Sequence, residues 1–137
     1  MKKIFPATVF VTVFLLLINN YAYGAIGGYS VNLANNEWEA LVDTQVQIIA
    51  DLTNNQDRIQ PFAYLVQIQD ENGVTVSLSW IAGALEPGQF MSPSQSWTPT
   101  NLGKYTAEIF VWESVDNPDA LSVPLIIKIN VVESRNT

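Results

Sequence analysis

Hydrophobic and polar residues alternate along most of this chain beyond residue 28. Residues 44–54, TQVQIIADLTN, and residues 61–70, PFAYLVQIQD, carry apolar side chains at every second position. Because successive side chains of a β-strand point to opposite faces, this period predicts strands with one face in a core. The same period predicts strands at 28–33, 74–80, 104–113 and 121–132. The expected inward residues include Val46, Ile48, Ala50, Leu52, Phe62, Tyr64, Val66, Ile68, Val74, Val76, Leu78, Trp80, Tyr105, Ala107, Ile109, Val111, Leu121, Val123, Leu125, Ile127, Ile129 and Val131.

Turn signals separate these segments. Asn72-Gly73 predicts a tight hairpin turn, because such a turn needs positive φ, and Pro87-Gly88 predicts a second turn. Prolines 93 and 99 limit the stretch around them to an edge or looped strand. The spacing is typical of an antiparallel β-sandwich of about seven strands. A parallel α/β fold would need crossover helices, and no helical pattern is longer than NEWEALV at 36–42.

The first 24 residues have a different pattern. Lys2 and Lys3 precede an almost unbroken apolar run from Ile4 to Ile18, and small residues follow at Ala22 and Gly24. This order predicts a signal-peptide helix over residues 1–24, cleaved before residue 25, because about 15 apolar residues are too few for a spanning helix. The mature domain would then be residues 25–137, secreted or held in the cell envelope. It would meet the membrane only through an uncleaved signal segment.

Charge and composition exclude several functions. The chain has a net charge of −7, and loss of Lys2 and Lys3 would leave four basic residues against 13 acidic ones. Nucleic acid is therefore not an expected partner. The chain has no histidine and no cysteine, which removes Ser-His-Asp and thiol catalysis, haem, disulfides and the usual zinc sites. We expect no enzyme and no organic cofactor.

The acidic loop residues are compatible with one cofactor, a calcium ion. In the usual strand order of such a sandwich, the loops TNNQDR and ESVDNPDA lie at the same end. Hard cations prefer carboxylate and carbonyl oxygens, although Asp and Asn are also ordinary loop residues and no EF-hand spacing occurs. The candidate ligands are Asp51, Asp57, Glu113, Asp116 and Asp119.

The segment NLGKYTAE carries a more particular resemblance. It is similar to the corner of immunoglobulin-like domains, with Gly103 and Tyr105 at the positions of the turn glycine and of a Tyr that bonds back to the backbone. Ala107 stands where antibody domains keep a cysteine, which excludes the antibody variety. Residues 28–133 as a whole resemble the CARDB and fibronectin-like modules of prokaryotic, especially archaeal, secreted proteins. The resemblance implies an extracellular binding or architectural role without catalysis.

Large apolar side chains are also expected on the outer face of the sheet. If Tyr105 and Ile109 point inward, the alternate residues of that strand point outward, beside the outward residues of the strands at 61–70 and 121–132. Contiguous apolar patches often mark interfaces, although the segment around Trp38 could instead cover this one. The predicted contact residues for a protein or surface-polymer partner are Leu65, Phe110, Trp112 and Ile126.

The expected function is therefore cell-surface binding or adhesion by a non-catalytic module. An alternative is a filament subunit assembled by strand donation, because AIGGYSVNL at 25–33 combines flexible glycines with an alternating pattern. A calcium or carbohydrate binder at the acidic loop end is the remaining alternative.

Overall fold

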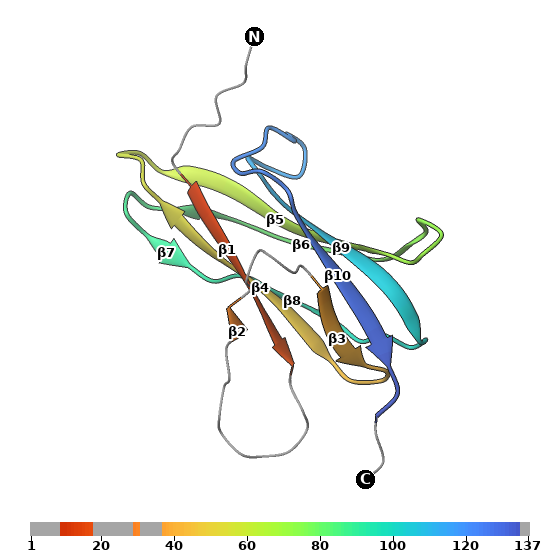
Figure 1. The fold of residues 1–137 in the computed structure, drawn as a ribbon. Helices are drawn as coiled ribbons and strands as arrows, with labels where there is room; N and C mark the ends of the chain where they lie inside the picture. The colour runs from red at the N-terminus through yellow and green to blue at the C-terminus, as the bar shows by residue number, and fades with distance from the viewer. Residues whose placement is uncertain (1–8, 18–28, 31–36, 135–137) are drawn as a thin grey trace.

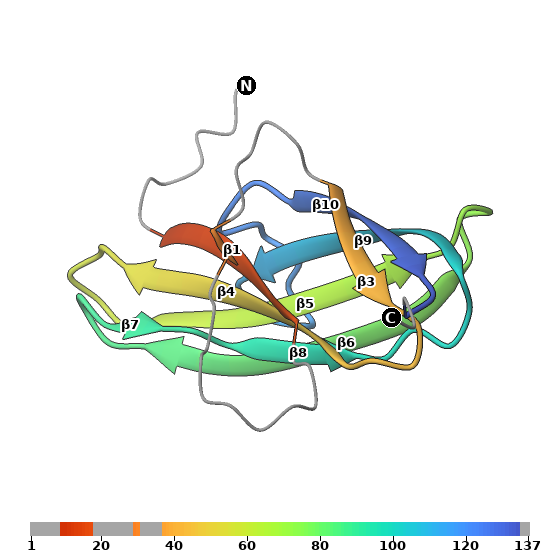
Figure 2. The same cartoon turned by 60° about the horizontal axis from the view of Figure 1, so that its bottom comes forward.

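Two β-sheets packed face to face form the molecule (Figure 1). The computed structural model describes residues 9–17, 29–30 and 37–134. Strands of both sheets run in roughly the same direction in Figure 1, which is the aligned packing of β-sandwiches. Figure 2 shows the same fold turned by 60°. The predicted all-β sandwich is confirmed.

Sheet A has the order β2-β1-β4-β7, and β8 also pairs with β4. β4 is the longest strand of sheet A within residues 37–134. Along β4, buried and half-buried residues alternate. Prolines 93 and 99 flank short strands only, as predicted. The strands are β1 (Val9–Leu17), β2 (Tyr29–Ser30), β4 (Val46–Asn54), β7 (Phe90–Met91) and β8 (Ser94–Trp97).

Sheet B has the order β3-β10-β9-β5-β6. The strand at 103–112 lies between the strand at 60–69 and the final one, as the sequence predicted. β3 pairs with β10 in parallel, so the sandwich is not wholly antiparallel, and the helix-like pattern of NEWEALV is a strand. The strands are β3 (Glu37–Leu41), β5 (Gln60–Gln69), β6 (Thr75–Leu85), β9 (Gly103–Trp112) and β10 (Leu125–Val132).

Residues 9–17 lie at the centre of the predicted signal-peptide helix, but the structure describes them as strand β1. All nine residues pair antiparallel with β4. The sequence VFVTVFLLL is rich in Val and Phe, which favour strands, and the edge of β4 supplies backbone partners. The signal-peptide helix over residues 1–24 stays a prediction. The other residues of the segment 1–24 lie outside the described ranges, and cleavage stays a prediction.

The core lies between β4 and the inward rows of β5, β9 and β10. Most predicted inward residues are buried there, including Ile48, Tyr64 and Ile109. The Tyr64 hydroxyl crosses between the sheets and donates a 2.7 Å hydrogen bond to the backbone oxygen of Ile48. Burial raises the pKa of Tyr64 well above its ordinary value, so this donor stays protonated.

The inward orientation predicted for four residues of strand β6 and the turn before it is wrong. Val74, Val76, Leu78 and Trp80 are 46–57% exposed. Leu78 pairs with Gln67 and Trp80 with Leu65, which are outward positions of β5. The period of two defines which residues share a face but not which face is buried. The inward row of β6 contains Gly83 instead, because the Phe62 ring lies within 3.2 Å of where a Cβ would be.

Val123 was also expected in the core and is 61% exposed. It precedes Pro124, and β10 begins only at Leu125, so the inward register starts after the proline.

The two predicted turns are confirmed. Gly73 has φ of 75°, and its amide donates a hydrogen bond to the backbone oxygen of Asp70. In the second turn, the Gln89 amide donates to the backbone oxygen of Glu86.

Asn54 joins three segments at one end of the core. Its side chain is fully buried, and its Nδ2 atom donates to the backbone oxygens of Arg58, Leu85 and Glu86 at 2.8–3.2 Å. Its Oδ1 atom accepts from the Gln56 amide at 3.0 Å. This side chain therefore links the end of β4 to the following loop and to the end of β6.

We predict that Asn54→Ala lowers the free energy of unfolding by about 3 kcal/mol, because it leaves buried backbone oxygens without donors. Asn101 is exposed, and its side chain donates a 3.3 Å hydrogen bond to the exposed Thr100 Oγ1, so it offers the matched control. Asn101→Ala should change stability by less than about 0.5 kcal/mol. Urea denaturation of the two variants measures the difference, and equal losses would contradict the role given to Asn54.

We predict that Tyr64→Phe costs about 1–2 kcal/mol, because it removes the hydrogen bond between the sheets. The wild-type protein should also lose stability as pH rises above 10.0, the ordinary pKa of Tyr, because the unfolded state then releases a proton that folded Tyr64 retains. Denaturation between pH 8 and about pH 11 should show a shallower decline for Tyr64→Phe. An identical decline in both proteins would contradict this assignment.

Candidate functional site

The outer face of sheet B carries large apolar side chains on four neighbouring strands. Leu65 on β5 pairs with Trp80 on β6 and with Phe110 on β9, so these three side chains form one row across the sheet. A neighbouring row runs through Leu78, Gln67, Glu108 and Ile126. Six residues of this face together form what we call the outer apolar patch: Leu65, Leu78, Trp80, Phe110, Trp112 and Ile126.

The members of the outer apolar patch differ in exposure. Leu78, Trp80 and Ile126 are 54%, 53% and 48% exposed. Phe110 and Trp112 are half-buried, with ring centroids 5.5 Å apart, and Leu65 is buried between its cross-strand neighbours. All four contact residues predicted from the sequence therefore share this face.

The sequence reasoning missed Leu78 and Trp80. It placed them inside the core on the same alternation that located the others. Ser77 and Ser79 pair with the inward residues Ile68 and Val66 of β5, so the small polar row of β6 faces inward. The alternation alone held no signal for this, because it defines the two faces but not which one is buried.

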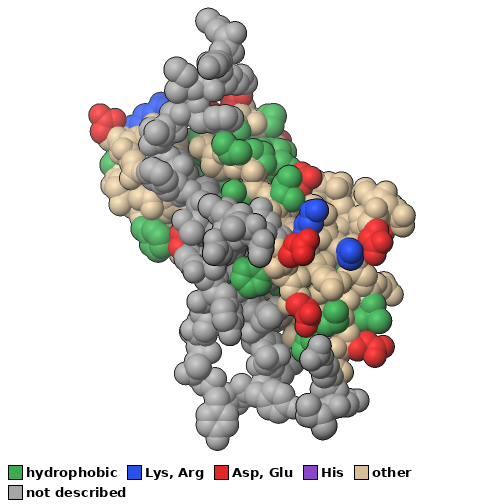
Figure 3. All heavy atoms as spheres, in the orientation of Figure 1, with side chains coloured by type: hydrophobic (Ala, Val, Ile, Leu, Met, Phe, Trp, Pro, Cys, Tyr) green, Lys and Arg blue, Asp and Glu red, His purple; other side chains and the backbone are tan. Residues whose placement is uncertain are grey.

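Charged residues lie on one side of the apolar patch on the same sheet, towards β3. Lys128 on β10 is opposite Glu37 on β3, and Asn130 is opposite both Glu39 and Lys104. Figure 3 shows acidic and basic side chains next to one another over β10. The outer face is therefore divided into an apolar part, centred on β5, β6 and β9, and a charged part towards β3.

The segment around Trp38 does not cover the patch in the part that the structure describes. Residues 37–41 form β3, at the far edge of sheet B from β6, and Trp38 packs against the core. The Trp38 indole N–H is buried and has no hydrogen-bond acceptor among the described residues.

The structure does not assemble the predicted calcium ligands. Asp51 lies on β4 and accepts a 2.6 Å hydrogen bond from Ser92 Oγ, while Asp57 is exposed in the β4–β5 loop. Glu113 accepts from Asn117 Nδ2, and Asp116 and Asp119 are exposed in the same loop. Over residues 37–134, no three acidic side chains come together in a group suited to a metal ion.

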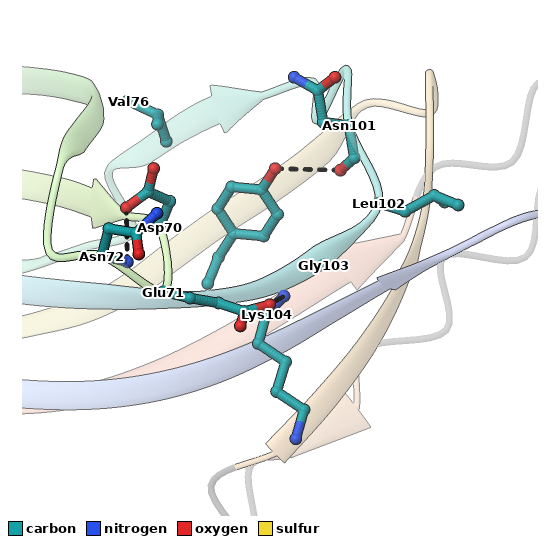
Figure 4. A pocket seen from close by; sticks show the side chains of 9 residues that line it. Asp70, Glu71, Asn72, Val76, Asn101, Leu102, Gly103 and Lys104 are labelled. Carbon is teal, nitrogen blue, oxygen red and sulfur yellow. Dashed lines mark hydrogen bonds between the residues drawn. The ribbon is translucent and has the colours of Figure 1, made fainter.

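A shallow pocket of about 310 Å³ lies at the β5–β6 turn (Figure 4). Asp70, Glu71 and Asn72 face the loop before β9 across it. Glu71 Oε1 accepts from the Lys104 amide at 3.1 Å, and Asp70 Oδ1 accepts from the amides of Asn72 and Val74. The carboxylates are thus engaged in holding the turn, and no nucleophile and base pair is present among the lining residues.

The corner predicted at this end is confirmed. The Tyr105 hydroxyl donates a 3.0 Å hydrogen bond to the backbone oxygen of Asn101. Gly103 has φ of 137°, which a residue with a Cβ rarely adopts, and Trp97 packs edge-on against Tyr105 at 5.0 Å. The chain reverses direction here to start β9.

Among the described residues, there is no helix with the length and hydrophobicity needed to cross a membrane.

Comparison with known proteins supports the fold. No protein-family model and no curated protein matches the sequence. The CARDB domain of the PF1109 protein from Pyrococcus furiosus, solved with di-metal ions, matches with a TM-score of 0.54 and 15% identity over 93% of this chain and 96% of that chain. Its solution structure gives a TM-score of 0.55 and 17% identity.

Two further solved structures are similar over part of their length. The C-terminal domain of wzt matches with a TM-score of 0.57 and 12% identity, over 89% of this chain and 71% of that chain. A β-glucuronidase of glycoside hydrolase family 2 matches with a TM-score of 0.52 and 17% identity, over 64% of this chain but only 10% of the enzyme. The chain therefore has a CARDB-like β-sandwich fold, shared with the PF1109 domain at low sequence identity.

Proposed function

We propose that this chain is a non-catalytic binding module that holds a protein partner against the outer apolar patch, outside the cell or in its envelope. The observation that carries the proposal is the exposure of Leu78, Trp80 and Ile126 on one sheet face, with two half-buried aromatic rings between them. Exposed aromatic residues surrounded by polar ones are typical of protein interfaces. The charged residues towards β3 would form one side of the polar rim.

Two observations support a role without chemistry. The whole chain lacks histidine and cysteine. The pocket at the β5–β6 turn is lined by carboxylates that already accept backbone hydrogen bonds. The matched glycosidase region is one tenth of that enzyme chain, so the likeness to it supplies no argument for sugar hydrolysis.

A second candidate function is supported by the pairing of β1. If residues 1–24 are removed as the sequence predicts, β4 loses a partner along all nine of its residues. A free strand edge accepts a strand from another copy, and AIGGYSVNL would be the donor. Light scattering of the processed protein tests this candidate: an open series of oligomers supports strand donation, and a single closed species contradicts it.

We predict that a photoreactive amino acid at position 80 cross-links a partner on intact cells, because Trp80 lies in the outer apolar patch. The matched control carries the same group at position 128, which is exposed on the charged part of the same face. An adduct with another protein from position 80 alone supports the proposed surface. Equal adducts from both positions, or none from position 80, would contradict it.

We predict that Leu65→Ala costs about 2–4 kcal/mol, whereas Ile126→Ala costs less than about 1 kcal/mol, because Leu65 is buried and Ile126 is half exposed. Chemical denaturation of both variants measures the difference. Similar large losses at both positions would mean that Ile126 is covered in solution and unavailable to a partner.

A further inference from the structure

Strand β6 is the edge of sheet B, and its second side has no strand partner among the described residues. Its 11 residues pair with β5 on one side only, and Figure 2 shows the strand along the lower side of the molecule. Nearly all of its side chains are exposed or half-buried. A long row of backbone amides and carbonyls is therefore available for pairing.

β6 also lacks the features that usually protect an edge strand. Natural edges carry charges, prolines or short strands, which discourage pairing with another chain. The opposite edge of the same sheet follows this rule, because β3 has only five residues and exposes Glu37 and Glu39. Residues 74–85, VTVSLSWIAGAL, contain neither a charged residue nor a proline.

The charge distribution favours a second copy of this chain as the occupant. The chain has a net charge of −7, so most approaches between two copies are repulsive. β6 is a neutral strip between Glu71 and Glu86. In an antiparallel pairing centred on Trp80, Glu86 of one copy lies opposite Val74 of the other, and no two like charges meet along the strand.

We propose that two copies of this chain pair antiparallel through β6 about a two-fold axis, joining their five-stranded sheets into one continuous sheet. The two Trp80 side chains would then meet at the axis, and each Leu78 would lie opposite Ala82 of the other copy. Cross-strand pairs of aromatic and aliphatic residues stabilise sheets. Because the axis is two-fold, the assembly closes as a dimer.

This inference goes beyond the proposed function, because it uses the backbone edge and not the sheet face. In such a dimer, the outer apolar patches of both copies point to the same side. They form one surface of twice the area, available to the same partner. The two proposals can fail separately, since one concerns self-association and the other concerns binding of a different protein.

The first experiment measures the oligomeric state of purified Leu78→Lys and Ile126→Lys by analytical ultracentrifugation. Both residues are about half exposed and share one row of the outer face, but Leu78 is on β6 and Ile126 is on β10. We expect the wild type to be a dimer, Leu78→Lys to dimerise about tenfold or more weakly, and Ile126→Lys to remain dimeric. Thermal melts verify that both variants fold, and Val76→Lys offers a second edge variant.

The second experiment uses the absence of native cysteine. Trp80→Cys places a single thiol at the proposed axis, where paired strands bring Cα atoms within disulfide range. Leu78→Cys, Ala82→Cys and Ile126→Cys serve as neighbouring and distant positions. Oxidation should produce a covalent dimer most rapidly from position 80, more slowly from positions 78 and 82, which lie opposite each other and not opposite themselves, and far more slowly from position 126.

Three results would overturn the β6 dimer. One is a wild-type protein that stays monomeric at high micromolar concentration. Another is self-association that Ile126→Lys abolishes and Leu78→Lys leaves intact, since it would place the contact on the sheet face. The last is an open series of larger oligomers, which a two-fold strand pairing cannot produce.

Discussion

The burial of the inward rows of β5, β9 and β10 against β4 is the interaction on which the rest of the structure depends. Side chains such as Ile109, Ile129 and Ile48 are almost fully removed from water between the two sheets. Burial of apolar area is the main favourable term in folding, and this chain has no disulfide to supplement it. The Tyr64 hydroxyl then fixes the relative position of the sheets through its bond to Ile48 O. The corner at Tyr105 and the cluster around Asn54 fasten the loops around that core.

The outer face of sheet B is free to vary because the inward rows already provide the core. Antiparallel sheets commonly place polar residues on the face that meets water. This sheet does so near β3 and β10, where acidic and basic side chains lie together, but across β5, β6 and β9 it combines Gln67 and Glu108 with large apolar side chains. The retention of Trp80, Leu78 and Ile126 at the surface costs solubility without adding much to the core. The proposed contact with another protein would account for that pattern, and the uncharged edge of β6 lies beside it.

Much of the fold could be predicted from the sequence, because its signals were local. The Asn72-Gly73 turn and the Tyr105 corner depend on backbone geometry within a few residues. The order of β5, β9 and β10 followed from the strand pattern of an immunoglobulin-like sandwich. The candidate site was predicted in part, since Leu65, Phe110, Trp112 and Ile126 do share the outer face.

Most of the errors arose where a long-range contact decides the outcome, whereas Val123 was misplaced because β10 begins only after Pro124. The facing of β6 depends on Phe62 filling the space over Gly83, which periodicity cannot reveal. The parallel pairing of β3 with β10 joins segments about 90 residues apart in the chain. The predicted calcium site needed the acidic residues of two loops to come together, and loop conformations of that kind cannot be predicted from turn residues alone. Residues 9–17 pair with the edge of β4, and the signal peptide over residues 1–24 stays a prediction.

The central claim is that the core faces one side of sheet B while the other side presents apolar side chains to water. Methyl NMR of the free protein with a soluble gadolinium chelate measures this directly, because relaxation increases with proximity to solvent. We predict strong enhancement for the methyl groups of Leu78 and Ile126 and little for those of Ile48 and Leu52. Equal protection of all four residues would contradict the account, since the outer face would then be buried.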